Sequence, residues 1–469
     1  MSESWSSRVC CIGAGYVGGT TAPILAQKCS DCRVSVVDID QERINAWNSP
    51  TLPIYEPRLQ EIVEEVRGKN LFFTCEHREQ EIREAEVIFI AVNTGTKEFG
   101  YGAGRAYDLT AWEAVARSIA RSADQERLYI IVEKSTVPVC TAEHVRSILY
   151  ASRKSTKTEF QVISNPEFLA EGSAVLNLTD PDRVLIGGDA STENGRYAIE
   201  RVSWLYEHWI PKAKILTTNL WSSELAKLAA NAFLAQRISS INALSAVCEA
   251  TGADIDEVAH VVGTDTRVGP KFLKTSVGWG GSCFKKDLNG LIYLCENFHL
   301  HEAAEYFRQV IHMNEYQKRR FGERILKHMF GTLRRKKIVV LGFAFKKDTG
   351  DIRESPAIDI CRFLSEEGAS LYIYDPKVLE TDIKALFPSC VVVDNDSPSH
   401  AIEATKDAHA IVVCTEWDEF KTYDYGQIYE GMKKPAFMFD GRNILDQAAL
   451  KEIGFHSFAI GKRSLHELH

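Results

Sequence analysis

The sequence lacks the features that mark several large classes of protein. A membrane span requires about 18–20 consecutive apolar residues, and no apolar run in the sequence approaches that length. No hydrophobic leader segment precedes the first predicted strand. Basic residues are not in excess, since 55 Lys and Arg stand against 64 Asp and Glu for a net charge of −9. Nucleic acids and anionic membranes bind basic faces, so we expect neither as a partner. We expect a cytoplasmic protein.

A disulfide framework and a metal site are not indicated either. The 12 cysteines show no paired spacing, and we expect them as reduced thiols. The C-x-x-C formed by Cys29 and Cys32 stands alone, which is a weak zinc signal. No H-E-x-x-H occurs among the 13 histidines. We therefore predict no metal.

The composition is that of a globular protein. Of the 469 residues, 45% are hydrophobic and 25% are charged, which excludes intrinsic disorder and collagen. The length predicts roughly three domains. Short apolar runs beginning at Val9, Val34, Glu86, Leu128 and Val162 alternate with helical patterns up to about residue 216. This alternation predicts a parallel α/β sheet.

The pattern changes after that region and later returns. Apolar residues recur at helical spacing from Trp221 to Ala250, and helices continue to Phe330. From Lys337 the α/β pattern resumes, and a strand ends at Asp375 much as an earlier one ends at Asp38. We predict an α/β fold with two doubly wound Rossmann-like domains joined by a central helical domain with one long helix. The expected domains are 1–218, 219–330 and 331–469.

A glycine-rich turn follows the first predicted strand. In a dinucleotide-binding turn of this kind, the first glycine permits a tight turn, the second a close backbone approach to a pyrophosphate, and the third helix packing. Asp38 ends the second strand, where an acid binds ribose hydroxyls and disfavours NADP, so we predict NAD. Arg43 is expected to flank the adenosine. The motif comprises Gly13, Ala14, Gly15, Tyr16, Val17 and Gly18.

A second motif is Gly280-Gly281-Ser282-Cys283, followed by Asp287. Ser282 is expected as the N-cap of a helix, which would place Cys283 in the first turn, where its thiolate is favoured. Asp287 would then lie one turn further on the same face. The motif is consistent with a nucleophile and a water-orienting carboxylate, or with a buried structural cysteine.

Lys227 and Asn231 form a similar pair four residues apart on the long helix. A lysine within an apolar pattern is either an edge residue whose head reaches solvent or a buried functional cation. The segments 134–138 and 165–171 follow predicted strands, at the edge where open α/β sheets bind ligands, although each is also consistent with a turn.

These segments together carry a family resemblance. In order and at family spacing, 11–19, 46–57, 133–139, 164–172, 280–284 and 342–349 resemble the UDP-glucose 6-dehydrogenases, especially the animal-type enzymes. The resemblance runs from about Arg8 to about Gly461. It implies NAD-dependent oxidation of the C6 hydroxyl of UDP-glucose to a carboxylate in two hydride transfers, through thiohemiacetal and thioester intermediates on a cysteine.

The resemblance also implies residue roles. Cys283 matches the nucleophile, and Lys227, assisted by Asn231, the group that stabilises the oxyanion. Asp287 with Thr136 matches the pair that orients water, and Glu167 the general acid–base. The implied cofactor contacts beyond the first motif are Val92, Thr94, Ser135, Thr136, Glu171, Lys286 and Arg353. The implied substrate contacts are Glu167, Phe168, Leu169, Lys227, Asn231, Ile238, Arg267, Phe272, Leu273, Lys274, Ser276, Trp279, Gly280, Phe284, Phe345, Lys346 and Arg442.

The resemblance further implies a homo-oligomer, with a hexamer favoured and a dimer as its building block. It also implies that Arg267 reaches a neighbouring subunit's site and that UDP-xylose is a possible feedback inhibitor. Two alternatives stay open. One is oxidation of another nucleotide sugar, such as UDP-N-acetylmannosamine, and the other is a binding protein that has lost turnover. Retention of Cys283, Lys227, Asp287 and Glu167 argues against the second.

Overall fold

The computed structural model describes residues 5–463. The chain divides into two compact units within the long helix α9 (Leu220–Thr251), between Ala230 and Asn231. In the described residues, no helix is both long and apolar enough to cross a membrane. The three predicted domain boundaries stay a prediction.

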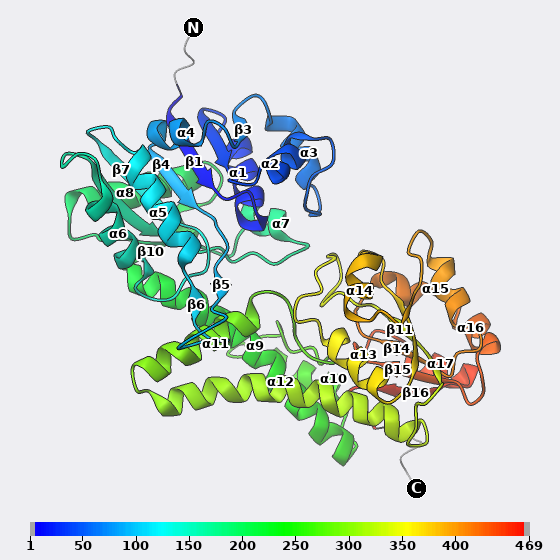
Figure 1. Ribbon diagram of the computed structural model, residues 1–469. Coiled ribbons are helices and arrows are strands. Elements are labelled where there is room, and N and C mark those ends of the chain that lie inside the picture. The colour runs from blue at the N-terminus through cyan, green and yellow to red at the C-terminus, as the bar shows by residue number, and fades with distance from the viewer. Residues whose placement is uncertain (1–4, 464–469) are drawn as a thin grey trace. The chain divides into compact units, whose positions relative to one another are not determined.

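The first unit is built on an eight-stranded sheet (Figure 1). The strand order is β10-β9-β8-β7-β4-β1-β2-β3, and every pair is parallel except β8 with β9. The strands are β1 (Ser7–Ile12), β2 (Cys32–Val37), β3 (Leu71–Thr74), β4 (Val87–Ile90), β7 (Leu128–Glu133), β8 (Glu159–Ser164), β9 (Val184–Gly187) and β10 (Ile215–Thr218). A separate antiparallel pair joins β5 (Gly95–Thr96) to β6 (Tyr107–Asp108).

Helices cover both faces of this sheet because both faces of its strands are apolar. Alternate residues of β1 belong to two different clusters: Val9 and Cys11 to one, and Cys10 and Ile12 to the other. The first cluster includes residues of α1 (Tyr16–Lys28), α2 (Gln41–Asn48), α3 (Leu59–Val66), α7 (Ala174–Thr179) and α8 (Glu193–Glu207). The second includes residues of α4 (Arg78–Glu84), α5 (Thr110–Ser122) and α6 (Thr141–Ser152). A short 3-10 helix, η1 (Lys212–Lys214), precedes β10.

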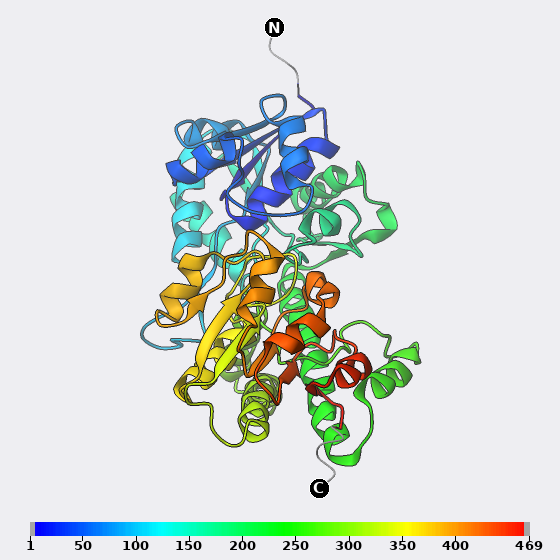
Figure 2. The same ribbon diagram turned by 90° about the vertical axis from the view of Figure 1, so that its right-hand side faces the viewer.

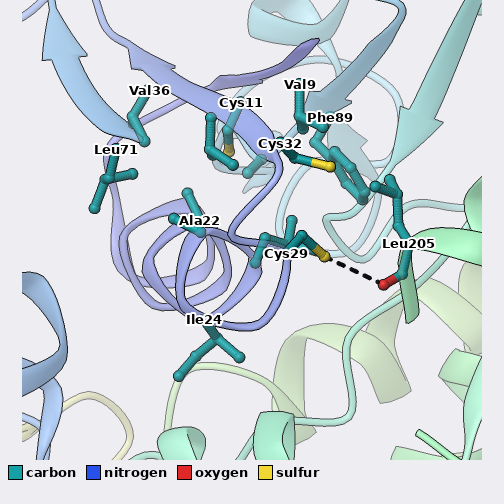
Figure 3. Packing of buried hydrophobic residues seen from close by; sticks show 14 of the residues in the cluster. Val9, Cys11, Ala22, Ile24, Cys29, Cys32, Val36, Leu71, Phe89 and Leu205 are labelled. Carbon is teal, nitrogen blue, oxygen red and sulfur yellow. Dashed lines mark hydrogen bonds between the residues drawn. The ribbon is translucent and has the colours of Figure 1, made fainter. Parts of the chain in front are cut away.

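The two cysteines of the C-x-x-C motif lie in the first cluster. Cys29 and Cys32 are 0% exposed, and the Cys29 thiol donates to the carbonyl of Leu205 at 3.4 Å (Figure 3). All 12 cysteines fall within the described residues, and none forms a disulfide. Within that same part of the chain, no group of His, Cys, Asp or Glu side chains is arranged to hold a metal ion.

The second unit carries a six-stranded parallel sheet, drawn from yellow to red in Figure 2. Its order is β13-β12-β11-β14-β15-β16, formed by β11 (Lys337–Leu341), β12 (Ser370–Tyr374), β13 (Val391–Val392), β14 (Ala410–Val413), β15 (Phe437–Asp440) and β16 (His456–Ala459). Helices pack on both faces: α13 (Pro356–Glu366), α14 (Glu380–Leu386), α15 (Pro398–Ala404), α16 (Tyr425–Gly431) and α17 (Gln447–Ile453), with a 3-10 turn, η2 (Asp418–Thr422). The two sheets confirm the predicted pair of doubly wound Rossmann-like domains.

Helices of the second unit form a further apolar cluster. The C-terminal part of α9 packs with α11 (Phe284–Asn297) and α12 (His301–His328), while α10 (Ile255–Thr264) contacts α9 in a smaller group. Ala232, Ala235, Trp279 and Leu288 are among the buried members. The predicted helix over Trp221–Ala250 is confirmed, and Gly252, at φ +87°, follows its end.

An aspartate holds the turn after the first strand in each sheet. In the first unit, Asp38 accepts a hydrogen bond from the Ala14 N–H at 2.7 Å. In the second, Asp375 accepts from the N–H groups of Phe343 and Ala344 at 2.7 and 2.9 Å. Burial raises the pKa of Asp375, against the effect of these N–H donors.

Candidate active site

The glycine turn after β1 has the geometry of a dinucleotide cradle. Gly13 has φ +109°, and a Cβ there would meet the Ala91 carbonyl oxygen at 2.6 Å. A Cβ at Gly18 would lie 1.9 Å from the Gly13 oxygen, so the close packing of α1 on the turn requires glycine. At Gly15, the N-cap of α1, a Cβ would meet nothing within 4 Å, and no side chain caps the helix there. The open side of Gly15 and the N–H groups at the helix start fit a pyrophosphate.

The predicted ribose-binding acid lies beside this turn. Asp38 is 8% exposed, and the Arg43 guanidinium approaches its carboxylate at 3.4 Å. Arg43 itself is exposed at the rim of the turn. A carboxylate held between the turn and an arginine fits a dinucleotide without a 2′-phosphate, as predicted for NAD.

Polar side chains that follow β4, β7 and β8 are linked by hydrogen bonds. The Ser135 hydroxyl donates to the Val92 carbonyl at 2.6 Å, and the Thr94 hydroxyl to the Thr136 carbonyl at 2.8 Å. The Thr136 hydroxyl in turn donates to the Glu167 carboxylate at 3.2 Å. The structure thus brings together predicted cofactor and catalytic residues at the carboxyl edge of the sheet.

Lys227 joins this group from α9. Its ammonium is 3.4 Å from Glu167 Oε1, and the two side chains are 3% and 8% exposed. The ammonium also lies 5.4 Å from the centre of the Phe168 ring, over which the Arg183 guanidinium stacks at 3.8 Å. Lys227 is therefore a buried cation, and the alternative of an edge lysine is wrong.

A second buried network supports the Glu167 segment. Lys134 donates to the Asn165 side-chain oxygen at 3.2 Å and to the Tyr206 hydroxyl at 3.0 Å. The Tyr206 hydroxyl donates to the same oxygen at 2.6 Å, and the Asn165 amide donates to the Leu185 carbonyl. These bonds fix the start of the segment that carries Glu167.

Two buried glutamates behind the loop 134–138 escaped the sequence analysis. Glu133 is 1% exposed, neither of its oxygens receives a hydrogen bond from a donor, and its carboxyl faces that of Glu224. Glu224 accepts from the Cys140 and Ala142 N–H groups at 2.8 and 2.9 Å. Burial and the facing carboxyl raise the pKa of Glu133 well above its usual range, and burial raises that of Glu224 to about 6. Burial therefore favours the protonated form of each carboxyl.

In the second unit, the predicted nucleophile lies at the start of α11. The expectation that Ser282 caps this helix is wrong, because Cys283 is the N-cap residue and α11 begins at Phe284. The left-handed Gly281 (φ +90°) turns the chain one residue later than expected, and the Ser282 hydroxyl lies 3.4 Å from the Cys283 sulfur. The half-buried thiol nevertheless belongs to the residue that begins the helix, although its side chain makes no capping hydrogen bond.

Asp287 lies one turn along α11, as predicted. Its N–H donates to the Cys283 carbonyl at 2.8 Å, and its side chain is fully buried. The Asn231 amide donates to the Asp287 carboxylate at 2.5 Å. Asn231 and Asp287 thus form one contact within this unit, while Lys227 pairs with Glu167 in the first unit.

The glycines before Cys283 pack against the segment after β11. A Cβ at Gly280 would lie 2.3 Å from the Glu354 oxygen, and one at Gly281 would meet the Phe345 ring at 3.0 Å. The Gly281 N–H donates to the Arg353 carbonyl at 2.9 Å. The thiol-bearing turn is therefore fixed to the segment 345–354 of the same unit.

Arg442 and its neighbours form a second predicted group. The Arg442 guanidinium donates to the carbonyls of Cys414 and Phe345 at 2.6 and 2.8 Å and lies 3.3 Å from the Glu416 carboxylate. Lys346 lies 5.6 Å from the centre of the Phe345 ring. Arg353 is exposed and pairs with Asp351 at 2.7 Å.

The predicted substrate segment 272–279 is only partly exposed. Phe272 has φ +62° and is 42% exposed, whereas Leu273 is buried and Lys274 is exposed. The Ser276 N–H donates to the Asn242 oxygen at 2.9 Å. This bond fixes the backbone of the segment at Ser276.

Trp279 belongs to the helical core. Its side chain is 5% exposed, its ring packs edge-on against Phe284 at 5.9 Å, and its indole N–H donates to the Ser239 hydroxyl. A substrate contact at this position would have to come from the backbone. Ile238 packs against the same cluster.

Arg267 lies apart on an exposed loop. Its side chain is 87% exposed, and its guanidinium pairs with Asp265 at 2.6 Å. The remaining predicted residues are half-buried, namely Tyr16 and Val17 on α1, Leu169 and Glu171 after β8, and Lys286 on α11.

The fold and the cradle define the class: an NAD-dependent oxidoreductase built on two Rossmann-like domains. Three domains of the UDP-glucose/GDP-mannose dehydrogenase family match the chain, the NAD binding domain at 7–210, the central domain at 221–316 and the UDP binding domain at 339–447. The chain belongs to this family, among the UDP-glucose 6-dehydrogenases.

Relatives match over nearly the full length. UDP-glucose 6-dehydrogenase 2 of Arabidopsis thaliana is 56% identical over 97% of both chains, and the UDP-glucose 6-dehydrogenase of Mus musculus is 56% identical over 97% of this chain and 93% of its own. Among solved structures, a UDP-glucose dehydrogenase from Pyrobaculum islandicum superposes with a TM-score of 0.81 at 29% identity, covering 97% of this chain and 99% of its own. A UDP-D-ManNAc dehydrogenase from Pyrococcus horikoshii gives 0.80 at 26% identity, covering 98% and 100%.

Proposed function

We propose that this protein oxidises UDP-glucose to UDP-glucuronate in two successive NAD-dependent steps. The observation that carries the proposal is the 56% identity to UDP-glucose 6-dehydrogenases of both a plant and an animal over 97% of the chain. Oxidation of UDP-N-acetylmannosamine is not favoured, because the relatives at 56% identity are named for UDP-glucose, whereas a solved dehydrogenase named for UDP-D-ManNAc is 26% identical.

The first unit would hold the cofactor. The open side of Gly15, the N–H groups at the start of α1 and the Asp38 carboxylate fit the pyrophosphate and a ribose. When bound, NAD supplies the hydride acceptor for both oxidations. Arg43, Ser135 and Thr136 would contact it from the neighbouring strand ends.

The second oxidation requires an adduct at C6, because the aldehyde carbon can release its hydride only after a nucleophile has added to it. We assign Cys283 as the nucleophile: its thiolate adds to C6 of the aldehyde, and the resulting thiohemiacetal loses hydride to become a thioester. The position of the sulfur at the N-cap of α11 supports this role, since helix N-termini favour the thiolate.

Lys227 and Asn231 would stabilise the oxyanion that forms at C6 during addition and hydrolysis. The burial of Lys227 supports this role, because a charge in a water-poor environment acts more strongly than an exposed one. Asp287 would orient water for thioester hydrolysis, and Glu167, which accepts from Thr136 and pairs with Lys227, would exchange the proton.

The nucleotide part of the substrate is assigned to the second unit. Phe272, Leu273, Lys274 and Ser276 lie on a segment whose backbone is fixed by Asn242, which suits backbone contacts to a base or phosphate. Arg442 and Lys346, beside Phe345, supply cations for phosphates and hydroxyls. Trp279, Gly280 and Phe284 would contribute through the turn that carries Cys283.

The stoichiometry of the reaction tests the proposal. We expect two NADH and one UDP-glucuronate per UDP-glucose consumed, measured by absorbance and mass spectrometry of the product. UDP-N-acetylmannosamine serves as the comparison substrate, and Cys75→Ser, at another half-buried cysteine, as the matched control for Cys283→Ser. One NADH with an aldehyde product would refute the thioester route, and preference for the acetylated sugar would refute the substrate.

We also propose a homo-oligomer, a hexamer whose building block is a dimer, with UDP-xylose as an inhibitor. Exposed apolar side chains on α9 and α10 support an assembly face, among them Leu244 at 41%, Val247 at 54% and Val261 at 71%. The exposed Arg267 would act on a neighbouring subunit. Mass photometry, with and without UDP-xylose, tests both points; a monomer that turns over normally would refute the assembly.

The animal-type resemblance at 46–57 and around 267–284 favours glucose as the sugar. The animal subtype itself stays a prediction, because the plant and mouse relatives are both 56% identical. A cytoplasmic location stays a prediction from the thiol content, and cell fractionation tests it.

A further inference from the structure

A buried carboxylate that has no role in the proposed chemistry joins two parts of the first unit. Glu56 lies between α2 and α3 and is 4% exposed. Its Oε2 accepts from the Tyr16 hydroxyl at 2.7 Å and from the Gly172 N–H at 2.8 Å, and its Oε1 accepts from the Ala174 N–H at 2.5 Å. The donors come from positions 40, 116 and 118 residues away.

Both ends of this bridge adjoin predicted site residues. Tyr16 is the first residue of α1 and directly follows Gly15, where the cradle is open. Gly172 directly follows Glu171 and ends the segment that begins at Glu167, and its φ of +78° marks a turn that a backbone bond to Glu56 holds. The bridge therefore ties the cradle to the segment that carries the general acid–base.

The chemistry of the bridge requires a carboxylate. Three donors converge from two sides, and only a group with acceptor sites on both terminal atoms can satisfy all of them. An amide of the same shape would point an N–H₂ group at a backbone N–H. Burial, the hydrogen bond to Glu56 and the nearby Glu56 and Glu171 carboxylates raise the pKa of Tyr16, so its hydroxyl stays a donor throughout the working pH range.

We infer that Glu56 is a positioning residue for dinucleotide binding and for the Glu167–Glu171 segment. It touches neither substrate nor cofactor in this assignment. It holds the cradle and the segment at one fixed spacing. The N–H groups at the start of α1 and the residues that follow β8 can then contact the same cofactor molecule. The effect on Glu167 rests on the function proposed above, whereas the effect on NAD binding does not.

Glu56→Gln and Tyr16→Phe in the full-length protein test the inference, with Glu61→Gln, an exposed acid on α3, as the matched control. NADH affinity is measured by fluorescence, UDP affinity by calorimetry, and the thermal midpoint alongside. For Glu56→Gln we expect NADH binding to weaken about tenfold, the loss of one hydrogen bond to a charged group. UDP binding should stay within about twofold, because the segments assigned to it lie in the other unit.

The double variant separates positioning from folding. If Tyr16 acts through Glu56, combining Tyr16→Phe with Glu56→Gln should weaken NADH binding little beyond Glu56→Gln alone. Unchanged NADH affinity in Glu56→Gln would overturn the inference. So would equal losses of NADH and UDP affinity with a lowered midpoint, which would mark a structural role only. If Glu56→Gln does not fold, Tyr16→Phe must show the selective loss by itself.

NADH binding also keeps this inference distinct from the proposed reaction. Selective loss of NADH binding in a protein that does not oxidise UDP-glucose would support the role of Glu56 and refute the proposed substrate. In a protein that does oxidise it, Glu56→Gln should raise the KM for NAD more than it lowers kcat.

Discussion

The raised pKa values of Glu133 and Glu224 make the stability of the first unit depend on pH in a defined direction. The substitution that exposes this effect is Glu133→Gln, because an amide has nearly the shape of a protonated acid and can donate to Glu224 at any pH. It removes the need for the folded protein to retain a proton at this place.

The sign follows from the raised pKa values of both carboxyls. Below the ordinary glutamate pKa of 4.5 the folded and unfolded chains both hold these protons, and the pair does not alter the free energy of unfolding. As the pH rises above that value, the unfolded chain releases its protons while the folded chain keeps them. Stability is therefore lost as pH rises, up to about pH 6 for Glu224 and over a wider range for Glu133.

The scale of such a penalty can be taken from Glu224, which is 1% exposed. A pKa raised from 4.5 to about 6 corresponds to about 2 kcal/mol. Burial keeps the pKa of Glu224 raised in the variant, so the gain comes from Glu133, whose amide replacement has no proton to retain. Because each pH unit above the ordinary value costs the parent about 1.4 kcal/mol at Glu133, Glu133→Gln should gain about 2 kcal/mol relative to the parent between about pH 5 and about pH 7. For a unit of this size, that gain raises the thermal midpoint by about 4–8 °C.

Thermal unfolding of the full-length protein at both pH values measures the effect. Glu143→Gln is the control, because Glu143 is an exposed acid on the adjacent helix α6 whose charge also acts on Glu224. We expect the midpoint difference between Glu133→Gln and the parent to widen with pH, and that of the control to change little. A difference that is constant with pH, or a variant less stable than the parent at about pH 7, would refute the raised pKa of Glu133.

Three further predictions concern the glycine turn after β1, the neighbouring Asp38 and the thiol of Cys283. Gly15→Ala should weaken NADH binding about tenfold with an unchanged thermal midpoint, since a Cβ there meets only open space. Gly18→Ala should instead lower the midpoint, because its Cβ would lie 1.9 Å from a carbonyl oxygen. Equal effects of the two substitutions would contradict the cradle geometry. Asp38→Ala should raise the KM for NAD and reduce the preference for NAD over NADP, and unchanged values for both cofactors would remove Asp38 from the ribose. Cys283→Ser should abolish release of UDP-glucuronate, with undiminished release, measured by mass spectrometry, refuting the nucleophile.

Periodicity and glycine spacing were sufficient to predict the architecture. The five predicted strands correspond to β1, β2, β4, β7 and β8, because each is a buried run with both faces apolar. In the same sheet β3, β9 and β10 were not predicted. β3 is buried only at alternate residues and β10 has no fully buried residue, whereas β9 is four residues long and fully buried like β4, and its length does not explain why it was missed. Short strands toward a sheet's edge carry too little apolar pattern to stand out from turns.

Contacts between distant segments are what the sequence did not reveal. Glu56 and Glu133 both lie within motifs that carry the family resemblance, yet nothing local distinguishes a buried carboxyl from an exposed one. Their burial depends on donors or acids more than 80 residues away in most cases, at Gly172, Ala174 and Glu224. The cap of α11 was misplaced by one residue, and the turn before it packs on a distant segment, since a Cβ at Gly281 would meet the Phe345 ring at 3.0 Å.

The aspartates that follow β2 and β12 occupy equivalent positions in the two sheets, but equivalent position does not imply equivalent function. Asp375 is 2% exposed and accepts from Phe343, Ala344, Lys377 and Val378 N–H groups and from the Trp417 indole. These donors saturate its lone pairs, so it can serve only as an internal clamp. An acid at this position is thus needed to hold the turn, whether or not it also binds a ribose. Restoring a glycine motif after β11 would not turn the second sheet into a dinucleotide site while five donors occupy its aspartate.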